Sequence, residues 1–148
     1  MVNLQVNSMV VAYEILTGAR FRICAVGTKT DEKLHLPYLE FQREARLSAP
    51  KEWPKLVHIL DYSAASGPPR DERSKALAES DGLFEFRTKG GLRLFWFYDE
   101  NQLVICANGF LKQGQKTPKR FLEEAKRWHK AYRKAKNDHT LTFLKPTK

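Results

Sequence analysis

Hydrophobic and polar positions alternate most clearly in the middle of the chain. Three runs rich in aromatic and β-branched residues follow one another there, at 82–88, 92–99 and 102–110. Such runs predict β-strands, and the short connections between them predict an antiparallel meander. The first connection, residues 89–91, ends in glycine, which suits the left-handed position of a bulged hairpin loop.

The segments before this meander predict one further strand and two helices. Residues 19–27 alternate early and end in glycine, which is typical of a strand. Residues 37–49 have a helical composition with Pro37 in the first turn, and apolar residues recur at helical spacing in 54–67. Residues 67–81 are rich in charged and turn residues, which predicts a surface loop.

The last periodic segment predicts a long basic helix. Thr117 is a suitable N-cap residue, and Pro118 is a suitable first helical residue. Beyond them, apolar and aromatic residues recur at spacings of three and four, which predicts one buried stripe. The stripe consists of Phe121, Leu122, Ala125, Trp128, His129 and Tyr132.

Loop lengths set the register of the meander, and the register decides which residues share a sheet face. Loop 89–91 places Arg87 opposite Arg93, and a two-residue loop at 100–101 places Arg93 opposite Asn108. The face of these polar residues also carries Glu85, Phe95 and Phe97. The opposite face carries the predicted core residues Phe84, Phe86, Leu94, Trp96, Leu103 and Ile105.

Two arginines that face each other repel unless an acid or an anion lies between them. Glu85 lies two residues from Arg87 on the same face and is one such acid. The register alone therefore leaves two interpretations of Arg87 and Arg93. One is an internal Arg–Glu ion pair, and the other is a site that holds an external anion.

Length and composition predict a single domain of a cytoplasmic protein. The chain has 148 residues, of which 42% are hydrophobic and 11% aromatic, enough for one core. No apolar run approaches the roughly 20 residues that span a bilayer, and the first residues lack the pattern of a secretory signal. We divide the chain into an extension at 1–18, the domain at 19–137 and a tail at 138–148, which either adds a short strand or stays unpaired.

Cys24 and Cys106 both lie in apolar, strand-like runs. This placement favours reduced thiols in the core, with a disulfide as the alternative. The sequence has no Cys/His spacing typical of a zinc site and no glycine-rich phosphate loop. We therefore expect no metal and no cofactor.

The positive charge is concentrated in the last quarter of the chain. Residues 1–109 hold 14 Lys/Arg and 14 Asp/Glu, whereas residues 110–148 hold 12 Lys/Arg and 3 Asp/Glu. The net charge of +9 therefore lies in the second segment. This asymmetry favours an anionic partner such as nucleic acid, an acidic protein or a membrane surface. The alternative is a helix that is basic only for solubility.

Basic and amide side chains are predicted to gather at one end of the sheet. Arg87 and Arg93 lie on strands, and Lys112 and Lys116 follow the third strand. Guanidinium groups bind phosphate through two parallel hydrogen bonds, lysines add point charge, and a helix N-terminus also favours anions. We therefore predict a phosphate-binding site. Its further RNA-binding candidates are Asn108, Gln113, Gln115, Lys119 and Arg120.

Such a site is able to cleave RNA without a metal. The 2′-hydroxyl attacks the adjacent phosphate, which requires a base, an acid for the leaving oxygen and positive charge near the phosphorane. Arginine and lysine stabilise that charge, and a lysine whose pKa is lowered by neighbouring cations is able to act as the base.

Four short motifs occur in fixed order in this region: LFEFR (83–87), LRLFWF (92–97), GFLK (109–112) and QKTP (115–118). In order and spacing they resemble the RelE/ParE toxin superfamily, and most closely its phage-derived, HigB-like branch. The resemblance extends over about residues 56–134. It implies a compact α+β, RelE-like domain with a twisted, mostly antiparallel sheet. N-terminal helices cover one face of that sheet, the other face is exposed, and a basic helix is C-terminal.

The resemblance also implies a function. Members of this branch cut mRNA on the ribosome and are neutralised by a small DNA-binding antitoxin. We therefore expect the toxin of a type II toxin–antitoxin system, a ribosome-dependent endoribonuclease with no cofactor and no membrane partner. The alternative is a non-catalytic binder of the same fold, either a ParE-like inhibitor of DNA gyrase or an inactive RelE-like protein.

The motifs assign roles by position. Arg87, Arg93 and Lys112 correspond to basic site residues of the family, and Lys116 to the lysine before the helix. The branch often has a second lysine where this chain has Gln113, which weakens the expected compensation of phosphate charge. Some members use a C-terminal tyrosine or histidine as acid or base. His139 is the candidate in this tail, and a solvated histidine is the alternative.

Overall fold

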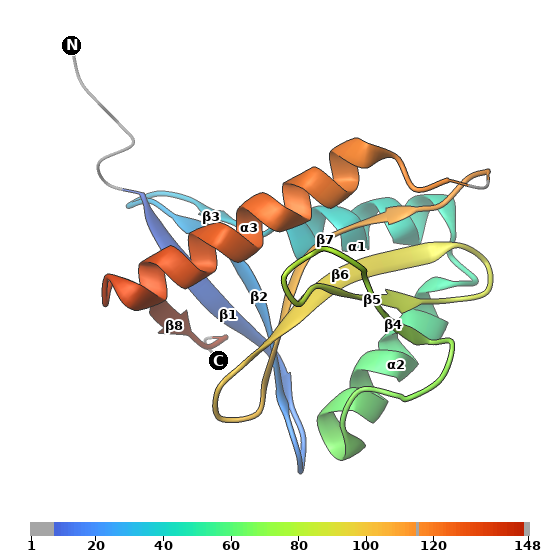
Figure 1. The fold of residues 1–148 in the computed structure, drawn as a ribbon, viewed down its shortest axis with the longest axis horizontal. Helices are drawn as coiled ribbons and strands as arrows, with labels where there is room; N and C mark the ends of the chain where they lie inside the picture. Colours follow the sequence, from blue (N-terminus) through green and yellow to red (C-terminus); the bar gives the residue numbers. More distant parts are fainter. Residues whose placement is uncertain (1–7, 115, 147–148) are drawn as a thin grey trace.

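The structure, a computed structural model, describes residues 8–114 and 116–146. Within this part of the chain it has three α-helices and a mostly antiparallel sheet of eight strands (Figure 1), which confirms the predicted α+β, RelE-like class. None of the described helices is both long and apolar enough to cross a membrane. The elements are β1 (Met9–Thr17), β2 (Arg22–Lys29), β3 (Leu34–His35), α1 (Pro37–Ser48), α2 (Trp53–Ser66), β4 (Ser74–Ala76), β5 (Phe84–Arg87), β6 (Leu92–Asp99), β7 (Leu103–Leu111), α3 (Lys119–Asn137) and β8 (Thr142–Leu144).

The strands follow the order β4-β5-β6-β7-β2-β1-β8, and β3 pairs with β2. The predicted meander is confirmed as β5, β6 and β7, and both predicted N-terminal helices form. β7 then pairs in parallel with β2, so a strand from far earlier in the chain extends the meander. The predicted loop at 67–81 contains a short edge strand, β4, which pairs with β5.

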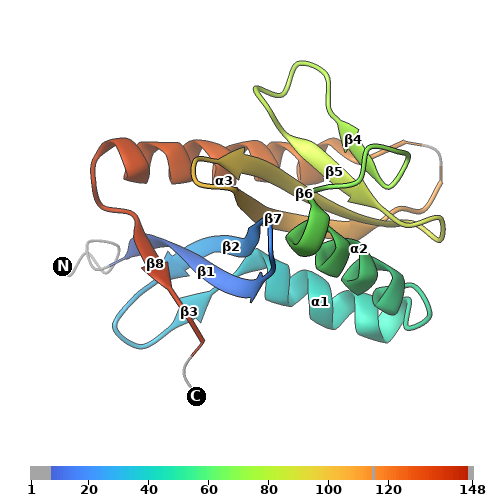
Figure 2. The same ribbon diagram turned by 90° about the horizontal axis from the view of Figure 1, so that it is seen from below.

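Both ends of the described chain join the edge of the sheet that lies opposite β4. β1 pairs antiparallel with β2, and β8 pairs in parallel with β1. Figure 2 shows β8 lying beside β1. The tail therefore adds a strand, which was one of its two predicted alternatives.

Helices cover both faces of the sheet. α1 and α2 lie against one face, and α3 runs across the other (Figure 1, Figure 2). The expectation of an exposed second face was wrong, because the face that carries Phe95 and Phe97 is apolar and packs against the apolar stripe of α3. In that stripe Ala125, His129 and Tyr132 are buried, as predicted.

The predicted register is correct for one hairpin and wrong for the next. Arg87 lies opposite Arg93, as the loop length indicated. In the β6–β7 hairpin, however, Asp99 pairs with Leu103, so the connection has three residues. This one-residue slip turns each side chain in the first part of β7 to the face opposite the predicted one. Leu103 and Ile105 therefore belong to the core under α3 and not to the core of Trp96.

A second irregularity moves Asn108 away from Arg93. The β6–β7 register shifts between Leu94 and Trp96, and Arg93 pairs with Phe110. Gly109 lies in this region, where an added Cβ would stand 2.6 Å from both the Arg93 carbonyl oxygen and Cδ1 of Phe41. Only glycine fits so close an approach of α1 and two strands, so packing from α1 helps to set the register.

The start of α3 also differs from its prediction. Pro118, and not Thr117, occupies the N-cap position, and no side chain caps the helix. Pro118 has an extended ψ of 134°, so the first helical turn begins after it. At the far end of the helix, Tyr132 donates a hydrogen bond of 2.5 Å to Asp99, which ties α3 to the β6–β7 connection.

Cys24 and Cys106 are free and buried in the sheet, as predicted for reduced core thiols. Burial raises the pKa of Cys24 to about 11 and also raises that of Cys106. A thiol with a raised pKa is a poor nucleophile near neutral pH. The two cysteines therefore act as core residues.

His129 should make the stability of the protein depend on pH. Its ring is buried, stacks on Phe97 at 4.1 Å and accepts a hydrogen bond of 2.8 Å from Arg133. Burial, followed by the charge of Arg133, lowers the pKa of His129 from 6.5 to about 4. The unfolded chain therefore binds this proton at a higher pH than the folded chain. The resulting stability is complete above pH 6.5 and is lost as the pH falls to about 4, a change of about 3 kcal/mol.

Urea unfolding of the wild type and His129→Gln at pH 7 and pH 4.5 measures this effect. The wild type should lose more stability on acidification than His129→Gln, while the exposed control His139→Gln should follow the wild type. Equal losses in the wild type and His129→Gln would contradict the assignment.

Candidate functional site

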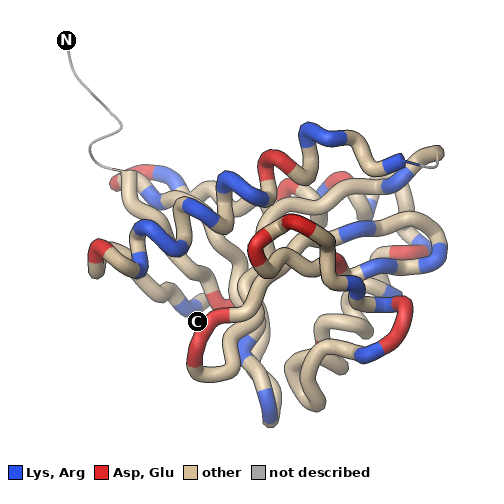
Figure 3. Tube along the Cα trace, viewed as in Figure 1, with Lys and Arg blue, Asp and Glu red and all other residues tan. Residues whose placement is uncertain are grey.

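Three basic side chains meet at one end of the sheet, and we call them the basic cluster: Arg87, Arg93 and Lys112. Arg87 ends β5 and pairs with Arg93 near the start of β6. Lys112 directly follows β7, and its backbone N–H donates to the Gly91 carbonyl at 2.7 Å. Three neighbouring strands thus bring these predicted residues together, and Figure 3 shows basic residues around this end of the sheet and along α3.

Glu85 lies within the cluster and joins its two arginines. One carboxylate oxygen stands 3.5 Å from Nε of Arg87 and 3.7 Å from Nε of Arg93. Glu85 is only 5% exposed. Burial raises its pKa, an effect opposed first by Arg93 and then by Arg87 and Lys112. The internal Arg–Glu ion pair, one of the two predicted alternatives, is therefore present, and one acid among three cations leaves the cluster with a net positive charge.

Arg93 is held by the fold itself. It is 8% exposed. Its Nη1 donates hydrogen bonds of 2.8 Å to the Thr88 carbonyl and 3.0 Å to the Leu92 carbonyl, which closes the β5–β6 turn. Burial and the charge of Arg87 lower the pKa of Arg93. The side chain of Arg87, by contrast, is 29% exposed, and it is the arginine of the cluster that solvent reaches more easily.

An aromatic contact places the first turn of α3 beside the cluster. Phe110 lies opposite Arg93 in the sheet and stacks on Phe121 at 4.6 Å. Arg120 lies over the Phe121 ring at 4.5 Å. The exposed Lys119 belongs to the same turn. The turn of α3 that packs on Phe110 thus carries two predicted RNA-binding residues.

The other predicted site residues have different positions. Lys116 and Gln113 are exposed on the segment between β7 and α3, and Gln115 lies outside the described residues. Asn108 is buried, and its Nδ2 donates to the Phe121 carbonyl at 3.0 Å. It therefore anchors α3 and does not lie opposite Arg93 as predicted.

His139 is not brought to the cluster. It follows the C-terminus of α3, whereas the cluster lies at the N-terminus. The helix has 19 residues, a length of roughly 28 Å at the usual rise per residue. Within the described part of the chain, no group of histidine, cysteine and acidic residues is arranged to hold a metal ion.

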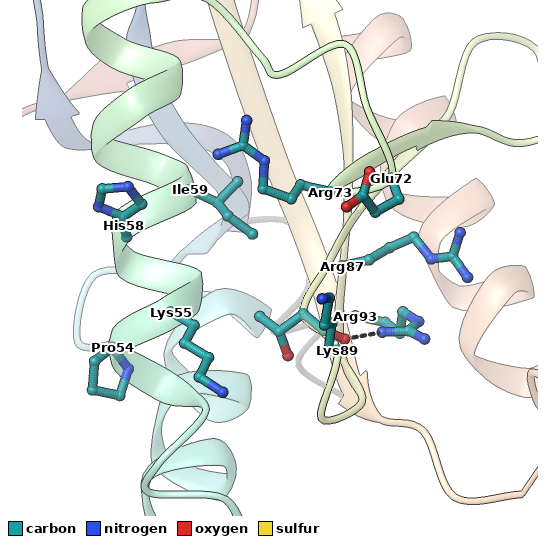
Figure 4. Close-up of a pocket in the computed structure, with 10 residues that line it drawn as sticks. Pro54, Lys55, His58, Ile59, Glu72, Arg73, Arg87, Lys89 and Arg93 are labelled. Atoms are coloured by element: carbon teal, nitrogen blue, oxygen red, sulfur yellow. Dashed lines mark hydrogen bonds between the residues drawn. The ribbon is translucent and has the colours of Figure 1, made fainter.

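A groove that the sequence did not indicate lies between α2 and the β5–β6 hairpin (Figure 4), and we call it the α2 groove. Its volume is about 640 Å³. Its lining residues are Pro54, Lys55, His58, Ile59, Glu72, Arg73, Arg87, Thr88, Lys89 and Arg93. They come from three separate segments, so the sequence motifs, which pointed to Arg87 and Arg93, could not have identified the groove itself.

The α2 groove and the basic cluster lie on different sides of the same hairpin. In Figure 4 the guanidinium groups of Arg87 and Arg93 extend away from α2, whereas Arg73 extends toward it. Arg73 also lies over the ring of Tyr62 in α2, at 5.0 Å. Arg87 and Arg93 thus line the groove while their guanidinium groups extend away from α2.

Residues 47–130 match the family described as phage derived protein Gp49-like. The matched segment covers more than half of the chain and includes α2, the meander, most of α3 and every residue of the basic cluster. No curated protein matches the chain.

Proposed function

Because this chain belongs to the Gp49-like family of phage-derived proteins, we propose that it is the toxin of a type II toxin–antitoxin pair. The family is of the RelE-related toxin kind. The motifs GFLK and QKTP support the finer placement in the HigB-like branch. A small DNA-binding antitoxin is the expected partner.

The proposed activity is cleavage of mRNA on the ribosome. The observation that carries this proposal is the basic cluster. In it, the half-buried Arg87 and Lys112 flank the buried Arg93 where β5 ends, β6 begins and β7 ends. A phosphate placed there would meet positive charge from two sides. Such preorganised charge stabilises a phosphorane more than it stabilises the starting diester.

The reaction needs no metal and no oxidant. The 2′-oxygen bonds to the adjacent phosphorus as its proton passes to a base. The bond from phosphorus to the 5′-oxygen breaks, and an acid protonates that oxygen. The products are a 2′,3′-cyclic phosphate and a 5′-hydroxyl. Arg87 and Lys112 would balance the phosphorane charge, and Lys116, Lys119 and Arg120 would bind the flanking RNA backbone.

A non-catalytic binder is the second candidate, and two observations favour it. Glu85 stands 3.5 Å from Arg87 and neutralises part of its charge. The cluster as defined also contains neither histidine nor tyrosine to act as acid or base. A ParE-like gyrase inhibitor or an inactive RelE-like protein would need neither a catalytic acid nor a catalytic base.

A reconstituted translation reaction with one defined mRNA tests the proposal. The purified protein should cut the mRNA only when ribosomes are present and leave 5′-hydroxyl ends. Intact mRNA beside a correctly folded protein would reject the nuclease. Inhibition of gyrase supercoiling without RNA cleavage would establish the alternative. Co-purification with the product of the neighbouring reading frame tests the antitoxin separately.

A further inference from the structure

We propose that the α2 groove binds an acidic segment of a partner protein, with apolar side chains of that segment inserted between α2 and the β5–β6 hairpin. This inference does not depend on RNA cleavage, because the groove and the basic cluster use different sides of the hairpin.

The groove has the size and lining of a binding site. Its volume of about 640 Å³ falls in the usual range for ligand sites, about 300–1,000 Å³. Pro54 and Ile59 give one apolar wall on α2, and Arg87, Thr88 and Arg93 line the wall formed by the hairpin. Such surfaces suit the aliphatic side chains of a peptide.

Cations from three elements surround this apolar interior. Lys55 belongs to α2, Arg73 precedes β4, and Lys89 lies in the β5–β6 turn. Glu72 is the single acid in the lining. This charge pattern complements a segment that carries several carboxylates.

The existing ion pairs of these cations do not prevent binding. Lys55 pairs with Glu52 at 2.9 Å, but its side chain is 61% exposed. Arg73 pairs with Asp71 at 2.8 Å near the surface. Surface pairs of this kind contribute only about 0–1 kcal/mol each, so a ligand carboxylate is able to share or replace them. Lys89 has no ion pair with any residue that the structure describes.

The walls are fixed before any ligand binds. A Glu52 carboxylate oxygen accepts a hydrogen bond of 2.8 Å from the Gly90 N–H, which joins the start of α2 to the tip of the hairpin. An added Cβ at Gly90 would lie 2.1 Å from Cδ of Glu52, so the contact depends on glycine. A preformed site binds more tightly, because less conformational freedom is lost on binding.

The lining favours a peptide over single-stranded RNA. Sites for single-stranded nucleic acid combine a basic groove with aromatic side chains on which bases stack. The ten lining residues include no phenylalanine, tyrosine or tryptophan. Two of the three lining arginines, Arg87 and Arg93, point their guanidinium groups out of the groove (Figure 4).

Selection from a displayed library of random twelve-residue peptides, against the folded full chain, tests the inference. Enriched peptides should combine Asp or Glu with Leu, Ile, Val or Phe. The most enriched peptide, made synthetically and titrated by calorimetry, should bind Lys55→Glu/Lys89→Glu at least about tenfold more weakly than the wild type. The matched control Arg127→Glu/Lys130→Glu carries the same charge change on exposed positions of α3 and should bind like the wild type.

A second variant separates filling of the groove from loss of charge. His58→Trp places a bulky ring at an exposed lining position and should also weaken binding at least about tenfold, with an unchanged melting temperature. The inference is overturned if no peptides are enriched or if the charge-reversed variant binds as tightly as the wild type. Displacement of the peptide by a ten-residue oligouridylate would instead identify the groove as a nucleic-acid site.

Discussion

Replacing Arg93 by methionine should lower the free energy of unfolding by about 3–5 kcal/mol. The change leaves Glu85, which is 5% exposed, with one arginine fewer at close range. It also removes the hydrogen bonds that the Thr88 and Leu92 carbonyls accept from Arg93. Hydrogen bonds from a charged donor contribute about 1.5–3 kcal/mol each. Because Glu85 keeps Arg87 at 3.5 Å, the loss of these two hydrogen bonds dominates the expected effect.

Urea unfolding followed by tryptophan fluorescence measures this loss. The double variant Glu85→Leu/Arg93→Met removes both buried charges, so it should recover only the part of the loss that the buried carboxylate causes, because the Thr88 and Leu92 carbonyls still lack their donor. A loss below about 1 kcal/mol for Arg93→Met, within the range of ordinary surface substitutions, would show that Arg93 does not hold the hairpin.

Replacing Arg87 by alanine should reduce mRNA cleavage about 10²–10³-fold while changing stability by less than about 1 kcal/mol. Its side chain is 29% exposed, so its loss opens no large cavity. Glu85 still has Arg93 at 3.7 Å, so its carboxylate stays compensated. The expected loss therefore reflects charge withdrawn from the phosphorane and not unfolding.

Primer extension on mRNA from the translation reaction measures this effect. Arg127→Ala, on an exposed position of α3, removes the same charge away from the cluster and should cleave like the wild type. Arg87→Lys keeps the charge but loses the planar fork, so its rate should lie between those of the wild type and Arg87→Ala. Cleavage by Arg87→Ala within threefold of the wild type would remove Arg87 from the proposed site.

Arg87 and Arg93 look alike in the sequence, since each stands next to the same hairpin loop. The structure gives them different tasks because burial differs. Arg93 donates to two backbone carbonyls and is enclosed, whereas the head of Arg87 remains partly in solvent. Alternation along a strand identifies the face of a side chain, but it does not reveal what covers that face.

The sequence by itself determined the features that depend on neighbouring residues. The meander follows from alternation and short connections, and the pairing of Arg87 with Arg93 follows from the length of loop 89–91. The buried stripe of α3 follows from its spacing. Side-chain periodicity and the glycine-ended loop 89–91 are local properties, so the sequence indicated them, whereas the β6–β7 connection is one residue longer than predicted.

Only the tertiary structure decided how these elements meet. Close packing of α1 against Gly109 accompanies the shift that places Phe110, and not Asn108, opposite Arg93. The packing of α3 covers the sheet face that was expected to be exposed. The α2 groove forms because α2 meets the β5–β6 hairpin, which lies much later in the chain. These outcomes depend on contacts between distant segments, which no local pattern encodes.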